Sequence, residues 1–239
     1  MNKSIYSLVL SDEVVDAVDA LARAAGMSRS AMINGILAER VAFVTPEMRL
    51  RGILDSLANS ITDAFMLSEK PTGSTLVCRT SLKYRYKPTV KYSVEIFSEN
   101  GKRAATGSRE DHAQRRDMMS RPQAWAGQLK VSFRSQNAQL IGDLTEFFKC
   151  WTALEQKYIA ERISVDILYT IQDGRFTRTL NMPSGGISED ELGTAVADYM
   201  AMLDGAMKEY FLKLPDVEAA ALAAEGYYRP RIAAREVIV

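Results

Sequence analysis

The sequence has few of the residues that build disulfide frameworks, zinc sites and histidine-dependent active sites. It contains two cysteines, Cys78 and Cys150, and one histidine, His112. Two cysteines so far apart do not suggest a disulfide framework, and one histidine is too few for the usual zinc ligand sets. A catalytic triad would have to use His112, which has no recognisable catalytic arrangement around it. We therefore expect no metal, no cofactor and no enzymatic activity.

An enzyme acting on nucleic acid is the weakest alternative that the sequence leaves open. Glu161, Asp166 and Asp173 are available carboxylates. Their place in a predicted hairpin explains them without a metal, and no nucleophile or base accompanies them.

Long apolar runs are also missing. No run approaches the roughly 20 residues that span a bilayer. The first residues lack the basic-then-apolar pattern of a signal peptide, so we expect a cytoplasmic protein without membrane contact.

A net charge is missing as well, because 30 Lys and Arg residues balance 30 Asp and Glu residues. The charge is nevertheless uneven: residues 1–44 carry −1, residues 79–134 carry +8 and residues 135–239 carry −6. Such polarity favours an anionic partner for the middle segment. Pairing of the basic and acidic segments within the fold, or between subunits, remains an alternative.

The first 45 residues predict one strand followed by two helices. Residues 3–10 alternate in strand fashion, with Tyr6, Leu8 and Leu10 on one side. Ser11 is a candidate N-cap, Gly26 is suited to ending a helix, and Ser28 is a second N-cap. One short strand and two helices cannot build a core alone, so this unit predicts a homodimer.

The run "LVLSDEVVDAVDALARAAGMSRSAMINGIL" resembles the ribbon-helix-helix superfamily of MetJ/Arc-type DNA-binding proteins. The resemblance covers residues 3–44 and is most specific in "GMSRSAMI". It implies that two chains pair their strands into an antiparallel ribbon that enters the major groove of double-stranded DNA, while the second helix points its start at a phosphate. The ribbon's outward positions would then be Lys3, Ile5, Ser7 and Val9, and the phosphate anchors would be Ser28, Arg29 and Ser30.

The outward ribbon positions depart from the family pattern. Base reading needs hydrogen-bond donors and acceptors, and Ile5 and Val9 supply none, although either could touch a thymine methyl group. A one-residue shift would turn Tyr6, Leu8 and Leu10 outward, which suits the core less well. The phosphate anchor has a physical basis of its own, because unpaired N–H groups at a helix start bind anions.

The remainder predicts an α+β domain with a mostly antiparallel sheet covered by helices. We place a connecting amphipathic helix and loop at residues 46–70, with the helix over 47–67, the α+β domain at 71–214 and a carboxy-terminal helix and tail at 215–239. Within the domain we expect strands over 76–87, 90–96 and 128–135, a helix near 136–160, a hairpin turning at Asp173-Gly174, and a helix that starts with the capping box Ser188 to Glu191.

Cations alternate with apolar residues along the first three strands of this domain. If the strands pair, one face of the sheet becomes basic, and like charges on neighbouring strands repel unless they are solvated or meet an anion. The segment 98–127 is a long basic loop that could order on a partner. The basic face would carry Arg79, Lys83, Arg85, Lys87, Lys91, Lys130 and Arg134.

These features favour a dimeric DNA-binding protein, with a transcriptional regulator as the first choice. The larger domain would add oligomerisation, effector sensing or further nucleic-acid contact. A plasmid partition or relaxosome accessory protein is an alternative within the same class. A non-catalytic protein-interaction scaffold, which uses the first module only to dimerise, is the alternative from another class.

Overall fold

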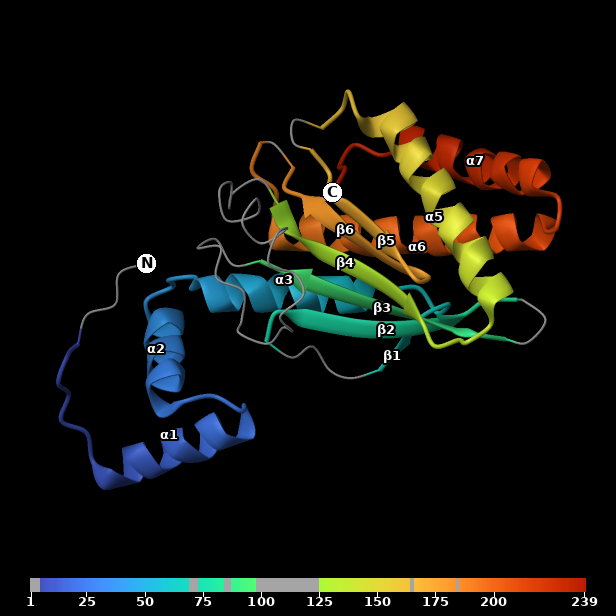
Figure 1. Ribbon diagram of the computed structural model, residues 1–239. Helices are drawn as coiled ribbons and strands as arrows, with labels where there is room; N and C mark the ends of the chain where they lie inside the picture. Colours follow the sequence, from blue (N-terminus) through green and yellow to red (C-terminus); the bar gives the residue numbers. More distant parts are fainter. Residues whose placement is uncertain (1–4, 69–72, 84–86, 98–124, 164–165, 184) are drawn as a thin grey trace. The chain divides into compact units, whose positions relative to one another are not determined.

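The computed structural model describes residues 5–68, 73–83, 87–97, 125–163, 166–183 and 185–239 (Figure 1). The chain divides into two compact units, Met1–Arg49 and Leu50–Val239. His112, Lys3, Arg85 and residues 98–124 of the predicted basic loop lie outside the described residues. None of the described helices is long and apolar enough to cross a bilayer.

The first unit contains the helices α1 (Asp12–Ala24) and α2 (Arg29–Arg40). Gly26 has φ +63°, the left-handed conformation that ends α1 as the sequence predicts. The sequence predicts the second helix from Ala31 to Phe43, but α2 ends at Arg40, and Ala42 turns the chain with φ +53°. Residues 5–10, the described part of the predicted strand, are not in a strand in this single chain.

The prediction that the connecting helix continues to residue 67 is wrong, because the helix ends at Ser60. Helix α3 (Pro46–Ser60) is followed by a turn, and Met66–Leu67 form a short strand β1. This strand pairs with β2 (Thr75–Ser81), with Met66 opposite Arg79. The apolar pattern continues beyond the end of the helix because Phe65, in the turn, is buried in the core of the second unit.

A single six-stranded antiparallel sheet forms the centre of the second unit, as the sequence predicts. Its spatial order is β1-β2-β3-β4-β6-β5. Besides β1 and β2 it contains β3 (Thr89–Ile96), β4 (Trp125–Phe133), β5 (Tyr169–Gln172) and β6 (Arg175–Asn181). All neighbouring strands pair antiparallel. The hairpin β5–β6 turns at Asp173-Gly174, where both residues have positive φ, as the sequence predicts.

Two strand boundaries differ from the prediction. Strand β2 stops at Ser81 instead of continuing to residue 87, because Leu82 donates its N–H to the carbonyl of Pro88 and closes a loop. Strand β4 begins at Trp125, inside the segment expected to be loop through residue 127. There a β-bulge between Trp125 and Gly127 keeps β4 paired with β6.

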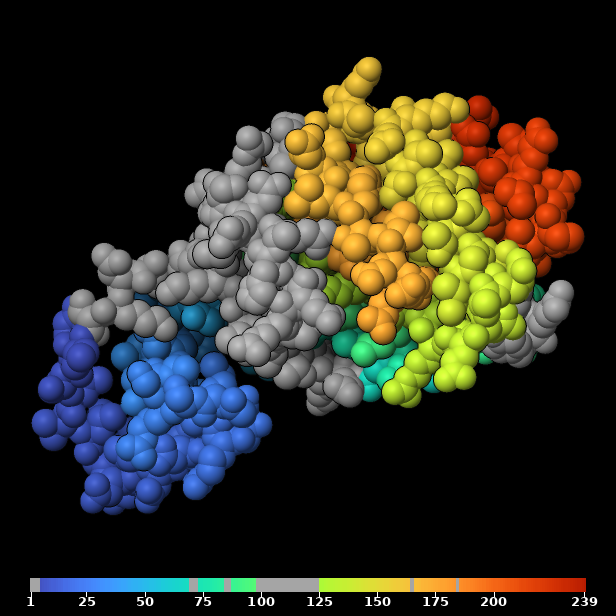
Figure 2. Space-filling view, in the orientation of Figure 1, coloured from blue at the N-terminus to red at the C-terminus, as the bar shows by residue number. Residues whose placement is uncertain are grey.

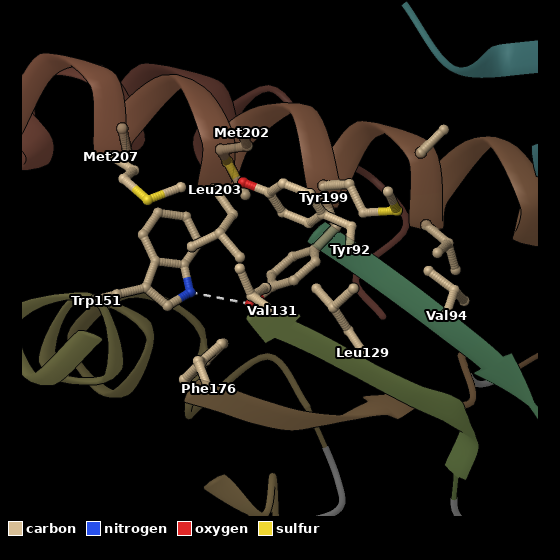
Figure 3. Packing of buried hydrophobic residues seen from close by; sticks show 14 of the residues in the cluster. Tyr92, Val94, Leu129, Val131, Trp151, Phe176, Tyr199, Met202, Leu203 and Met207 are labelled. Atoms are coloured by element: carbon tan, nitrogen blue, oxygen red, sulfur yellow. Dashed lines mark hydrogen bonds between the residues drawn. The ribbon is translucent and has the colours of Figure 1, made fainter. Parts of the chain in front are cut away.

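The apolar face of the sheet packs against helices α5 (Ala138–Ile159), α6 (Glu189–Lys213) and α7 (Val217–Ala233). Figure 1 shows α6 running along one side of the sheet. Figure 3 shows Tyr92, Leu129, Val131 and Phe176 directed from the strands toward α6, with Trp151 of α5 beside them. Strand alternation therefore turns one face of the sheet into the core and leaves the other face to the polar residues.

Local signals at the ends of the helices agree with the sequence. Ser188 and Glu191 form the predicted capping box at the start of α6. The last residues do not hang free: Val239 is 2% exposed and packs in the core of its own chain. Arg162 holds this tail by donating to the carbonyls of Ile232 at 2.9 Å and Arg235 at 2.5 Å.

Helices α3 and α6 approach each other closely at Gly193, and this contact can be tested. A Cβ on Gly193 would lie 2.7 Å from the Ile53 carbonyl oxygen and from the Leu57 nitrogen. We expect Gly193→Ala to lower the free energy of unfolding by about 1–3 kcal/mol through overpacking. Urea unfolding of the full chain measures the effect.

The matched control is Gly142→Ala in α5, where no atom lies within 4 Å of the added Cβ. This change should raise the free energy of unfolding by up to about 1 kcal/mol, because alanine favours helix more than glycine does. A Gly193→Ala variant as stable as the wild type would contradict the close helix contact.

Candidate nucleic-acid interface

The segment that the sequence assigns to the ribbon is exposed. Ile5 and Val9, two of the outward positions, are 100% and 102% exposed, and Ser7 is also exposed. The opposite series is exposed to a lesser degree, with Tyr6 at 82% and Leu8 at 61%. Residues 5–10 thus expose five large apolar or aromatic side chains and one serine. Contiguous apolar exposure of this kind is typical of interaction surfaces.

The first unit has little core of its own. Its buried apolar residues are Val18, Ala22 and Ala38. Many other apolar side chains of its helices and following loop are exposed, and they comprise Val14, Leu21, Met27, Ile36, Leu37, Val41, Phe43 and Val44. Three small or medium side chains provide little buried area for a unit of this size.

The start of α2 has groups that suit an anion. Ser28 is the N-cap, and its hydroxyl oxygen accepts a hydrogen bond from the Ala31 N–H at 3.2 Å. The hydroxyl of Ser30 and the N–H groups of the first turn lie beside this cap. A helix start of this kind attracts a phosphate by its N–H groups and its dipole.

Arg29, the third predicted anchor, is engaged inside the unit. Its Nε lies 2.5 Å from Asp19 Oδ1, and its Nη2 pairs with the second oxygen of the same carboxylate. The hydrogen bond from Arg29 lowers the pKa of the Asp19 carboxyl below its usual value. This two-pronged pair joins α1 to α2 and competes with any phosphate for the guanidinium group.

The predicted basic face is only partly formed by the sheet. Arg79 lies directly opposite Lys91, both are exposed, and Lys130 lies half-exposed on the same face. Lys83 and Lys87 are exposed but belong to the loop after β2, because that strand ends early. Arg134 is exposed one residue beyond the end of β4.

Sequence reasoning missed Arg175. Strand β6 pairs with β4 so that Phe176 lies opposite Val131, and both residues point into the core. Arg175 therefore points to the other face, where it is exposed beside Ser132. The missing information was that the distant hairpin adds its second strand to β4, which no local pattern predicts.

The buried ionisable groups do not form a site. Arg178 and Glu155 are both fully buried, and Arg178 Nε donates to Glu155 Oε2 at 3.2 Å. Burial opposes the guanidinium charge, but Glu155 raises the pKa of Arg178 above its ordinary value. The Arg178 guanidinium also lies over the Tyr199 ring. This pair is closed to solvent and serves the packing of α5, β6 and α6.

A second buried group, Asp204 of α6, binds the sheet. It accepts a hydrogen bond from the Tyr92 hydroxyl at 3.0 Å and pairs with Lys208 at 2.5 Å. Burial raises the pKa of the Asp204 carboxyl, while Lys208 opposes that rise. The arrangement satisfies a buried carboxylate and leaves no reactive group exposed.

Among the described residues, no group of three histidine, cysteine, aspartate or glutamate side chains could hold a metal ion. Comparisons with protein-family models, curated proteins and solved structures find no match to this chain. The assignment of the candidate interface therefore depends on the chemistry and exposure of its own residues.

Breaking the Arg29–Asp19 pair tests the phosphate anchor, because it should increase the affinity for duplex DNA. Asp19→Asn removes the carboxylate charge and releases Arg29 at the helix start that the resemblance assigns to a phosphate. We expect tighter binding of a duplex at 50 mM salt, measured by fluorescence anisotropy. The same variant should lack the stability that the wild type loses as the pH falls through the Asp19 pKa, because a lowered carboxyl pKa stabilises the fold only above the unfolded pKa.

The control is the double change Asp19→Asn with Arg29→Ala, which should return duplex affinity to the wild-type level or below. Equal or weaker binding by Asp19→Asn alone would show that Arg29 does not meet phosphate.

Proposed function

We propose that this chain is a homodimeric DNA-binding protein, with a transcriptional regulator as the best-supported role. The first unit of each chain would act as a ribbon-helix-helix module, and the second unit would add a regulatory or assembly function. The observation that carries the proposal is the exposed apolar segment at residues 5–10, directly before two helices that have almost no core; the Ser28 side chain caps the second, and the Ser11 side chain makes no capping bond at the first.

A second copy of the same segment is the partner that fits. Residues 5–10 carry an exposed apolar series, Tyr6, Leu8 and Leu10, that could cover the exposed helix residues of both chains once two copies pair as strands. An isolated two-stranded ribbon is marginal in water, but a ribbon packed on four helices is stable. Twofold symmetry would also place two α2 helix starts at equivalent phosphates of a duplex.

The outward side chains of the ribbon suggest how DNA would be bound. Ile5 and Val9 offer methyl contacts and no hydrogen bonds, while Ser7 offers one hydroxyl group. Affinity would therefore come mainly from phosphate contacts, with modest sequence preference. The same apolar positions support the second candidate, an interaction scaffold that dimerises through the ribbon and binds protein instead of DNA.

Two neighbouring lysine substitutions test the dimer and the ribbon together. Leu8→Lys would place a charge in the ribbon contact with the helices, and we expect the dimer dissociation constant to rise by at least ~100-fold. Val9→Lys would place the same charge on the outward face and leave the dimer intact. Sedimentation velocity over a range of concentrations measures both dissociation constants.

The same two variants separate DNA binding from the scaffold. Val9→Lys adds one cation to each strand of the ribbon, so duplex affinity at 100 mM salt should rise by roughly fivefold or more. Leu8→Lys should lose binding together with dimerisation. A wild-type chain that does not bind duplex at 50 mM salt would refute the DNA-binding function, and equal effects of the two lysines on assembly would refute the ribbon.

A further inference from the structure

The face of the sheet that points away from α6 carries a second candidate surface, which we call the basic face. It comprises ten neighbouring positions on β2, β3, β4 and β6 that point away from α6 by strand alternation. These positions are Val77, Arg79, Ser81, Thr89, Lys91, Ser93, Lys130, Ser132, Arg175 and Thr177.

The register places the cations of the basic face in line across the strands. Lys91 lies between Arg79 on β2 and Ser132 on β4, and Arg175 continues this row on β6. Lys130 lies in the next row, between Ser93 and Thr177. Neighbouring strands are about 4.8 Å apart, so the row from Arg79 to Arg175 extends over about 14 Å.

The composition of the basic face is specific. These ten positions hold four cations, five hydroxyl side chains and one valine, and the acidic residue of the same face, Glu95, lies at its end between Thr75 and Gln128. Like charges directly opposite each other, as in Arg79 and Lys91, destabilise a sheet. The face thus carries an electrostatic cost that a bound polyanion would relieve.

The absence of aromatic and large apolar residues at these positions indicates the kind of polyanion. Single-stranded nucleic acid is usually held by stacking of bases on aromatic rings. Protein partners are usually held by buried aromatic or aliphatic anchors. Val77 is the one apolar residue among the ten positions, and Met66 of β1, opposite Arg79, lies at the edge of the face. Cations and hydroxyl groups on a flat surface match the phosphate and sugar contacts that fix a duplex without reading its sequence.

We propose that the basic face binds the phosphate backbone of double-stranded DNA, as a second contact beside the ribbon-helix-helix module. The inference extends the proposed function and depends on it. Figure 2 shows the sheet from the side opposite α6, where atoms of β2, β3 and the β5–β6 hairpin reach the surface.

The test compares two variants of equal net charge. Arg79→Gln with Lys91→Gln removes two cations from the basic face. Lys149→Gln with Lys213→Gln removes two exposed cations from α5 and α6. Affinity for a 24-base-pair duplex of arbitrary sequence is measured by fluorescence anisotropy at several salt concentrations with each full-length chain.

We expect the face variant to lose about two units of the slope of log affinity against log salt, and to bind roughly tenfold more weakly at 150 mM salt. The helix variant should keep the wild-type slope. Urea unfolding should find the face variant as stable as the wild type or more stable, since the Arg79–Lys91 repulsion is gone. Arg175→Gln alone should lower the slope by about one.

Four outcomes would overturn the inference. If the face variant keeps the wild-type slope while the wild type binds duplex, the basic face is not a DNA contact, and the proposed function is unaffected. If the helix variant loses as much slope, the effect is one of net charge alone. If polyglutamate displaces the duplex as effectively as unlabelled duplex at equal charge, the surface serves acidic proteins. A wild type that does not bind duplex defeats both proposals together.

Discussion

The shortage of buried apolar surface in the first 49 residues is the constraint on which the account depends. Three side chains, Val18, Ala22 and Ala38, form the buried apolar part of that unit, whereas residues 5–10 and much of both helices are exposed. For a two-helix unit with so little core, the conformational entropy of ordering the chain is a large opposing contribution to its free energy of folding. In the proposed dimer, a second copy would supply the missing burial and would create the symmetry that a duplex matches.

The second unit solves the same problem internally. Its sheet buries one face against α5, α6 and α7, and two buried polar contacts, Arg178–Glu155 and Tyr92–Asp204, fix how the helices meet the strands. Because strand alternation sends every second residue away from this core, the other face is free to carry charge. The position of the cations on that face is therefore a consequence of the same alternation that builds the core.

Much of this architecture could be predicted from local sequence. The alternation in β2 and β3, the turn at Asp173-Gly174 and the capping box at Ser188 depend on residues close together in the chain, and all are present. The errors fall where distant segments decide the outcome. Helix α3 ends early because Met66–Leu67 pair with β2, and β2 ends early because Leu82 bonds to Pro88. Arg175 joins the basic face only because β6 adds to β4.

The candidate interface follows the same division. Helix starts and exposed apolar runs can be predicted from the sequence, but the Arg29–Asp19 pair cannot, because it joins two helices across a turn.

Hydrogen–deuterium exchange on the wild-type chain tests the pairing of residues 5–10 between two copies most directly. Amides of residues 5–10 should become protected as protein concentration rises through the dimer dissociation constant, because strand pairing between copies removes them from water. Rapid exchange of these amides at every concentration would contradict the paired ribbon.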